Sequence, residues 1–143
     1  MPFAKIMIHL VWSTKNRTPF LRNEIRPAIL DHIRSNSVEK GIYIDFINCH
    51  LDHVHCLISL GIDQNISKIV SLLKGESSHW INQQNLVVGK FSWQDEYFAV
   101  SVSESNIARV QDYIKIQDLH HKKKTFQDEY DEFLKIFQFK KLV

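Results

Sequence analysis

The sequence has few of the features that would place it outside the ordinary globular class. No stretch approaches the roughly 20 consecutive apolar residues that a membrane-spanning helix requires, and the 143 residues include only 4 glycines and 3 prolines. This shortage leaves little room for linkers, so we expect one domain over residues 1–143. Two cysteines, Cys49 and Cys56, are too few for a disulfide framework. We expect both to be reduced thiols in a cytoplasmic protein.

The net charge and the N-terminal segment exclude few further classes of protein. The formal net charge of +2 permits nucleic-acid binding without requiring it, so any basic surface must be local. The first 13 residues contain Lys5 and His9 and lack a small-residue cleavage pattern. We therefore expect neither a signal peptide nor membrane attachment.

The most informative stretch is residues 51–60, where His53 and His55 flank one apolar residue. Successive side chains of a strand point to opposite faces, so the two histidines would share a face. The alternate set would anchor the opposite face in the core: Val54, Cys56, Ile58 and Leu60. Two imidazoles side by side on a rigid strand are preorganised to bind one metal ion. A lone His-x-His also occurs often by chance, so the rest of the chain must decide between these interpretations.

Hydrophobic periodicity predicts strands at 4–13, 42–49, 53–60 and 97–103, with a tight turn at 51–52. It predicts helices at 24–40, 65–81, 105–122 and 125–139, and a loop at 83–95. We expect Asn23 to cap the first helix, whose inward side chains would include Val38, and Gly41 to end it; Asn65 or Asp63 would begin the second. The order predicts an α+β, ferredoxin-like fold: a four-stranded antiparallel sheet with helices on one face, plus C-terminal helices. The other face would be left for a ligand, a partner or a second subunit.

The third predicted helix carries Tyr113 and Gln117, four residues apart and hence on one helical face. Such a pair most often serves packing and solvation. A basic cluster follows at the helix end, formed by His120, His121, Lys122, Lys123 and Lys124. This cluster either complements the helix dipole or binds phosphate.

Three motifs appear together and in order: residues 11–17 (VWSTKNR), the pair His53 and His55, and residues 113–121 (YIKIQDLHH). Together they resemble the HUH single-tyrosine transposases of the IS200-like family, relatives of the REP-associated tyrosine transposases. The resemblance covers the chain from the first strand to the third helix. One departure is Asn16, where the family more often has an aromatic residue, which affects the contacts expected of this loop.

The resemblance implies a metal-dependent tyrosine nucleophile that cuts and rejoins single-stranded DNA at hairpin-flanked element ends. It implies Tyr113 as the nucleophile, forming a 5′-phosphotyrosine, and His53, His55 and Gln117 as ligands of Mg²⁺ or Mn²⁺. A tyrosine hydroxyl, with a reference pKa of about 10, needs such help at neutral pH. It also implies a homodimer in which the histidines of one subunit face the tyrosine of the other. Candidate contacts to DNA phosphates are Lys15, Arg17, Lys74, His120, His121 and Lys122 to Lys124.

Other functions stay open at this point. The same chemistry fits a domesticated nuclease acting on repeated palindromes. A non-enzymatic RNA-binding module would suit a ferredoxin-like sheet, but it leaves the histidine pair unexplained. A zinc-dependent hydrolase would need His53, His55 and a carboxylate such as Asp52 or Asp95. The remaining histidines, including His9, are expected to be structural or exposed, and His50 would pair with His53 across the hairpin.

Overall fold

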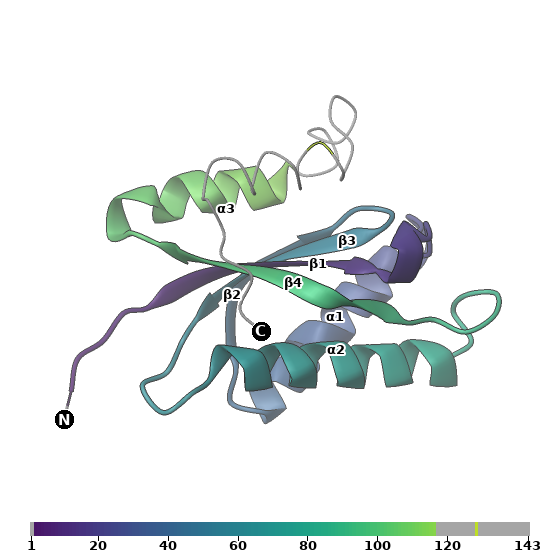
Figure 1. Cartoon of the computed structure of the whole chain (residues 1–143), viewed down its shortest axis with the longest axis horizontal. Coiled ribbons are helices and arrows are strands. Elements are labelled where there is room, and N and C mark those ends of the chain that lie inside the picture. The colour runs from purple at the N-terminus through teal and green to yellow at the C-terminus, as the bar shows by residue number, and fades with distance from the viewer. Residues whose placement is uncertain (1, 117–127, 129–143) are drawn as a thin grey trace.

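The computed structural model describes residues 2–116 and residue 128. Four strands form one antiparallel sheet in the order β2-β3-β1-β4 (Figure 1): β1 Met7–Thr14, β2 Tyr43–Cys49, β3 His53–Ser59 and β4 Trp93–Val102. Three α-helices accompany them: α1 Arg26–Glu39, α2 Ile66–Gln83 and α3 Ile107–Lys115. Short 3₁₀ turns lie at η1 Lys15–Arg17 and η2 Glu104–Asn106. The element order and the strand order are ferredoxin-like, which confirms the predicted fold class.

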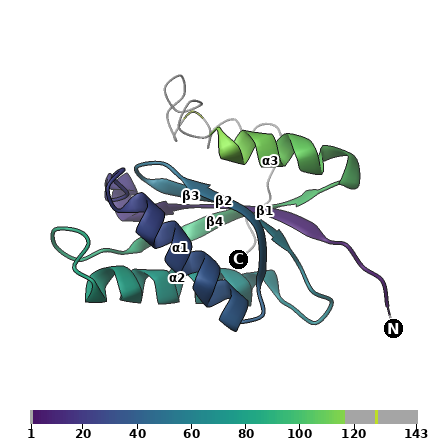
Figure 2. The same cartoon turned by 180° about the vertical axis from the view of Figure 1, so that it is seen from behind.

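The sheet is covered on both faces (Figures 1 and 2). Helices α1 and α2 lie on one face, here called the core face, and α3 lies on the other, here called the site face. The face that the sequence left open for a ligand or partner is therefore occupied by α3. As predicted, Val54, Cys56 and Ile58 point into the apolar cluster of the core face, while Leu57 belongs to a smaller cluster beneath α3.

Local signals fix several element ends. The Asn65 side chain caps α2 by accepting a hydrogen bond from the backbone nitrogen of Lys68 at 3.1 Å. Gly41 follows α1 with a φ of 70°, a left-handed conformation that glycine adopts without strain. Both predictions are confirmed.

Other local predictions are wrong. The residue before α1 is Ile25, which makes no side-chain cap, so Asn23 does not begin this helix. Val38 is 77% exposed and does not face the core. Strand β4 begins at Trp93 rather than at Tyr97. The sequence pattern missed this part of the strand because residues 94–96 are polar and lie where the register with β1 shifts. The third helix is described only to Lys115, and the expected terminal helix lies outside the described residues apart from Asp128.

A bulge in β2 changes which of its side chains face α3. Ile44 pairs with Ile58 and Phe46 pairs with Leu57, so Asp45 is the extra residue. From this point Phe46 and Asn48 share the face of the β3 histidines. A strict alternation along β2 would have turned both side chains to the core face.

None of the helices in the described part of the chain is long and apolar enough to cross a membrane. Both cysteines are buried thiols, and burial raises the pKa of Cys56 to about 12, against a smaller opposing effect of Arg34. The cytoplasmic location stays a prediction.

Candidate active site

The histidine pair lies on β3, at the end of the sheet that carries the tight hairpin turn. His53 and His55 are fully buried, and their ring centroids are 5.2 Å apart. They share the site face because one residue separates them on a regular strand. Across the sheet, His53 pairs with Ser13 and His55 pairs with Val11 of β1. A central strand with partners on both sides holds the two rings rigidly.

Tyr113 packs against His55 of this pair within the same chain. Its ring meets that of His55 edge-on, with 5.5 Å between centroids and an interplanar angle of 76°. The helix reaches this position because Ile107, Val110 and Ile114 form its apolar stripe and pack with Met7 and Leu57 of the sheet. The structure therefore brings the predicted nucleophile against one of the two predicted histidine ligands, His55.

Polar groups of β2 hold the C-terminal half of α3 in place. The Asn48 amide donates hydrogen bonds to the carbonyl oxygens of Ile114 at 3.0 Å and Lys115 at 3.4 Å. Both carbonyls belong to the last turn of α3 as the structure describes it. The Gln111 amide donates to the Asp45 carboxylate at 2.7 Å. Asn48 and Asp45 thus fix the rotation and height of the helix that carries Tyr113.

Each histidine of the pair has a hydrogen-bond partner at its Nδ1 atom. The Asp52 carboxylate lies 2.7 Å from Nδ1 of His53. Nε2 of His9 lies 3.0 Å from Nδ1 of His55. When Nδ1 of an imidazole is engaged in this way, Nε2 on the other side of the ring is the nitrogen left to bind a metal. The donor atoms therefore suit a divalent ion held by two imidazoles.

His9 is the site residue that the sequence did not single out. It lies on β1 opposite Leu57, so His55 is its diagonal neighbour, within reach of an aromatic side chain. Burial, followed by the neighbouring His55, lowers the pKa of His9 to about 3, and the ring is neutral at physiological pH. The alternation of the sequence along β1 shows that His9 shares a face with Met7 and Ser13. The sequence does not show that β1 pairs with β3, and it is this pairing that brings His9 to His55.

His50 behaves as the sequence predicted. Its backbone nitrogen donates to the carbonyl oxygen of His53 at 3.0 Å across the hairpin. The two rings lie 6.2 Å apart, and His50 is half-buried at the edge of the site.

The basic residues fall into three groups. Lys15 and Arg17 are exposed on η1, which adjoins the histidine end because the Thr14 nitrogen donates to the Asp52 carbonyl at 2.7 Å. Asn16, between them, has a φ of 56°, a left-handed conformation that asparagine tolerates. Lys74 lies on α2, and its ammonium donates to the carbonyl oxygens of Gln94 and Asp95. The third group, residues 120–124, and the predicted ligand Gln117 lie outside the described residues.

The metal ligands can be tested against the donor set. Within the described part of the chain, no group of three histidine, cysteine or carboxylate side chains is arranged to hold a metal ion. The Asp52 carboxylate is bonded to His53 and orients that ring, so it does not take the place of a third ligand that a zinc hydrolase would need. Two imidazoles leave room for further ligands of a divalent ion, and the predicted third ligand, Gln117, lies outside the described residues.

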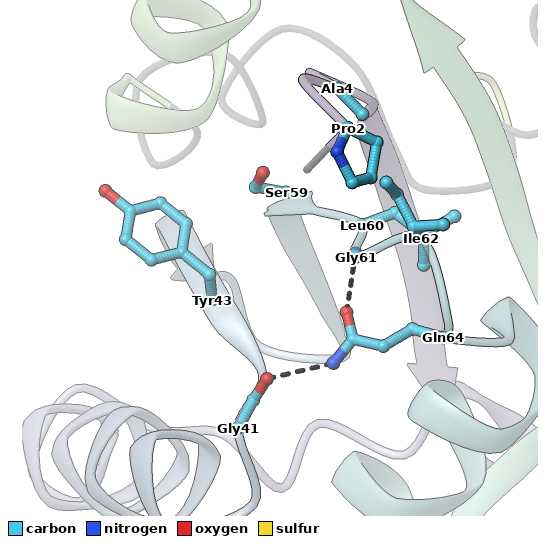
Figure 3. Close-up of a pocket in the computed structure, with 9 residues that line it drawn as sticks. All are labelled: Pro2, Ala4, Gly41, Tyr43, Ser59, Leu60, Gly61, Ile62 and Gln64. Atoms are coloured by element: carbon cyan, nitrogen blue, oxygen red, sulfur yellow. Dashed lines mark hydrogen bonds between the residues drawn. The ribbon is translucent and has the colours of Figure 1, made fainter.

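A separate hollow lies at the other end of the sheet (Figure 3). This pocket of about 370 Å³ is lined by residues including Tyr43, Ser59 and Gln64. Gln64 closes one wall by accepting from the Gly61 nitrogen and donating to the Gly41 carbonyl. Ser59 and His53 are six residues apart on β3, which places them about 20 Å from each other. None of the described residues that line the pocket carries an imidazole, carboxylate or ammonium group, and the pocket takes no part in the candidate site.

Together, the fold and the site define a class. A ferredoxin-like sheet with a histidine pair on a central strand and a tyrosine on the helix above it describes a single-tyrosine HUH protein. The model of the family described as "Transposase IS200 like" matches residues 3–117. The chain belongs to this family of transposases, which act in DNA transposition.

Individual relatives agree with this membership. The ISDra2 transposase TnpA of Deinococcus radiodurans is 30% identical over 114 residues, which cover 76% of this chain and 81% of the relative. The transposase of insertion sequence element IS200 from Salmonella typhimurium is also 30% identical, over 76% of this chain and 74% of its own length.

Solved structures share the fold. A crystal structure of a Deinococcus radiodurans R1 protein assigned as a transposase matches with a TM-score of 0.62 at 28% identity, over 81% of this chain and 93% of that one. A REP-associated tyrosine transposase bound to a REP hairpin matches with a TM-score of 0.64, over 85% of this chain and 72% of that one. At 18% identity, the second likeness shows the fold alone.

Proposed function

We propose that this transposase cleaves and rejoins single-stranded DNA at insertion-sequence ends through a covalent 5′-phosphotyrosine on Tyr113, with a divalent metal ion. The observation that carries the proposal is the edge-on contact of Tyr113 with His55, which brings the proposed nucleophile against a proposed metal ligand. We also propose that residues 1–143 form one such domain.

The chemistry assigns a role to each group. The Tyr113 oxygen attacks the scissile phosphorus and forms a phosphotyrosine, while the bond from phosphorus to the 3′ oxygen breaks. The proton that leaves the tyrosine is balanced by the one that the 3′ oxygen gains, so a free 3′-hydroxyl results. Because the phosphotyrosine conserves the energy of the broken bond, a second 3′-hydroxyl can reverse the step and join a new strand without ATP.

His53, His55 and Gln117 would hold the metal ion. When bound, a divalent ion acts as a Lewis acid that withdraws charge from the phosphate. Asp52 and the β-sheet keep the ring of His53 in place, and Asn48 keeps Tyr113 above the pair.

The substrate is proposed to be DNA with a hairpin beside the cleavage site. The REP hairpin bound by the structural relative supports hairpin DNA as the form to test. Lys15 and Arg17, exposed beside the histidine end, would contact backbone phosphates.

A covalent adduct tests the proposal. Incubation with Mn²⁺ and hairpin-flanked single-stranded oligonucleotides should give a protein–DNA band that resists denaturation. Tyr113→Phe should abolish this band, because phenylalanine has no hydroxyl. The matched control is Tyr43→Phe, since Tyr43 is 63% exposed at the other end of the sheet and should leave the band unchanged. An adduct that survives Tyr113→Phe would assign the nucleophile to another residue.

The proposed homodimer has a separate test. The single chain places Tyr113 against its own His55, and in a dimer with exchanged helices the same contact would form between subunits. Inactive His53→Ala and Tyr113→Phe proteins should then restore partial cleavage when mixed, because one of the two sites regains both groups. If subunit exchange is demonstrated and the mixture stays inactive, each site is built from one chain.

A further inference from the structure

We infer that His9 is a positioning residue: as the acceptor in a buried hydrogen bond, it fixes the tautomer and the orientation of His55 so that Nε2 of His55 is the metal-binding nitrogen. This inference rests on the proposed function for its metal, but the tautomer it assigns is a property of the metal-free protein.

The geometry provides the first step. The two nitrogens lie 3.0 Å apart in the interior, His9 is 6% exposed and His55 is fully buried. The rings are tilted by 34° with centroids 5.2 Å apart, which is a hydrogen-bonded arrangement rather than a stack. Both backbones belong to paired central strands, so neither ring can turn away without disturbing the sheet.

The hydrogen bond has a direction, which provides the second step. An N–H···N bond holds one hydrogen between its two nitrogens. If Nε2 of His9 donates, a neutral His55 carries its own hydrogen on Nε2 and cannot bind a metal there. If Nδ1 of His55 donates, the lone pair of its Nε2 is available. The second direction is the one compatible with His55 as a ligand.

The neighbouring histidine shows the same design with a different partner. Nδ1 of His53 lies 2.7 Å from the Asp52 carboxylate, which can only accept when ionised. His53 therefore carries its hydrogen on Nδ1. His9 would do for His55 what Asp52 does for His53, with a neutral acceptor in place of a charged one. A buried neutral partner avoids placing a second carboxylate beside the phosphate that the site would bind.

The first experiment measures the tautomer directly. Two-dimensional ¹H–¹⁵N spectra of histidine side chains in the metal-free protein should show His55 with its hydrogen on Nδ1, the less common form of free histidine. In His9→Leu, the signal of His55 should shift towards the Nε2–H form. Detection of Nε2–H on His55 in the unaltered protein would overturn the inference, whether or not the variant folds.

The second experiment measures Mn²⁺ binding by calorimetry, without DNA. His9→Leu should weaken Mn²⁺ binding by about 10–100-fold, as is typical for the loss of an outer partner of a metal ligand. His9→Gln should recover most of that loss, because its amide oxygen can accept from Nδ1 of His55. The matched control is His32→Leu: His32 is a partly buried histidine that contacts Glu76 and Trp80 on the core-face helices, and its loss should leave affinity unchanged.

The outcomes separate the two levels of the argument. An unaltered protein that fails to bind Mn²⁺ but shows His55 as Nδ1–H contradicts the proposed metal site and upholds the assignment of the hydrogen bond. Equal Mn²⁺ affinity in the unaltered protein and His9→Leu contradicts the positioning role of His9, while leaving the proposed function in place.

Discussion

The two faces of strand β3 are equally buried but carry different chemistry. On β3 the core-face residues Val54, Cys56 and Ile58 and the site-face residues His53, His55 and Leu57 are all 0% exposed. The core-face side chains belong to an apolar cluster with residues of α1, α2 and the neighbouring strands. On the site face two of the three are imidazoles, and each is hydrogen-bonded to another side chain.

The helices on the two faces are also held differently. Packing on the core face is apolar, and full burial of one aliphatic side chain stabilises a fold by about 1.5–3 kcal/mol. Helix α3 rests on a small apolar cluster and on hydrogen bonds from Asn48 and to Asp45, each contributing about 1 kcal/mol. The core face therefore supplies most of the stability, which leaves the site face able to hold polar groups for chemistry.

The largest expected effect separates activity from stability. Ile58→Ala should lower the free energy of unfolding by about 2–5 kcal/mol, since it opens a cavity in the core face, with little change in cleavage per folded molecule. His55→Ala should abolish cleavage although the protein still folds. Urea denaturation and adduct formation on the same samples measure both quantities. Normal cleavage by His55→Ala would show that the site face is structural only.

A second effect concerns acid. The unfolded chain protonates His9 near pH 6.5, whereas the folded protein resists protonation of this buried ring down to about pH 3. The contribution of the neutral His9 ring to the free energy of unfolding is thus complete above about pH 6.5. As the pH falls from there towards 3, this stability is lost by about 1.4 kcal/mol per pH unit at the steepest point.

Urea denaturation between pH 7 and pH 5 in the presence of a chelator measures this slope. His9→Gln, which has no titrating group, should lose stability less steeply than the unaltered protein. His32→Gln provides the comparison on the core-face helices. Parallel pH profiles for the unaltered protein and His9→Gln would contradict the assignment.

A smaller effect is expected at the end of α3. Asn48→Leu removes the two hydrogen bonds to the carbonyls of Ile114 and Lys115, at about 1 kcal/mol each. Hydrogen exchange of α3 should accelerate selectively, and adduct formation should slow by about tenfold or more. Asn82→Leu is the control, since Asn82 bonds the backbone of Phe91 beside α2 and should not affect α3 selectively. Equal effects of both substitutions on α3 would mean that the helix is held by its apolar side alone.

The smallest effect distinguishes two lysine and arginine positions. Arg17→Ala should reduce the dependence of single-stranded DNA binding on salt by about 0.7 in the log–log slope, the value for one phosphate contact. Lys74→Ala should leave the slope unchanged and instead lower stability slightly, because its ammonium already bonds the β4 backbone. Binding titrations at several salt concentrations measure both slopes. A reduced slope for Lys74→Ala would show that Lys74 contacts a DNA phosphate.

Much of the architecture was determined by the sequence itself. Strict alternation around His53 and His55 fixed their common face, because a strand has a side-chain period of two and the intervening residues are apolar. Asn65 and Gly41 marked helix ends through chemistry that acts within a few residues.

Only the tertiary structure decided which groups meet in the site. His9 joins His55 because β1 pairs with β3 in one particular register. Asn48 reaches α3 because the extra residue Asp45 shifts the alternation of β2. The residue types along β2 do not predict this bulge. The placement of α3 over the histidines likewise depends on Met7 and Leu57, from two separate strands. These are contacts between segments far apart in the chain, and their free energy arises only when the sheet has assembled, so the local pattern of residues could not contain them.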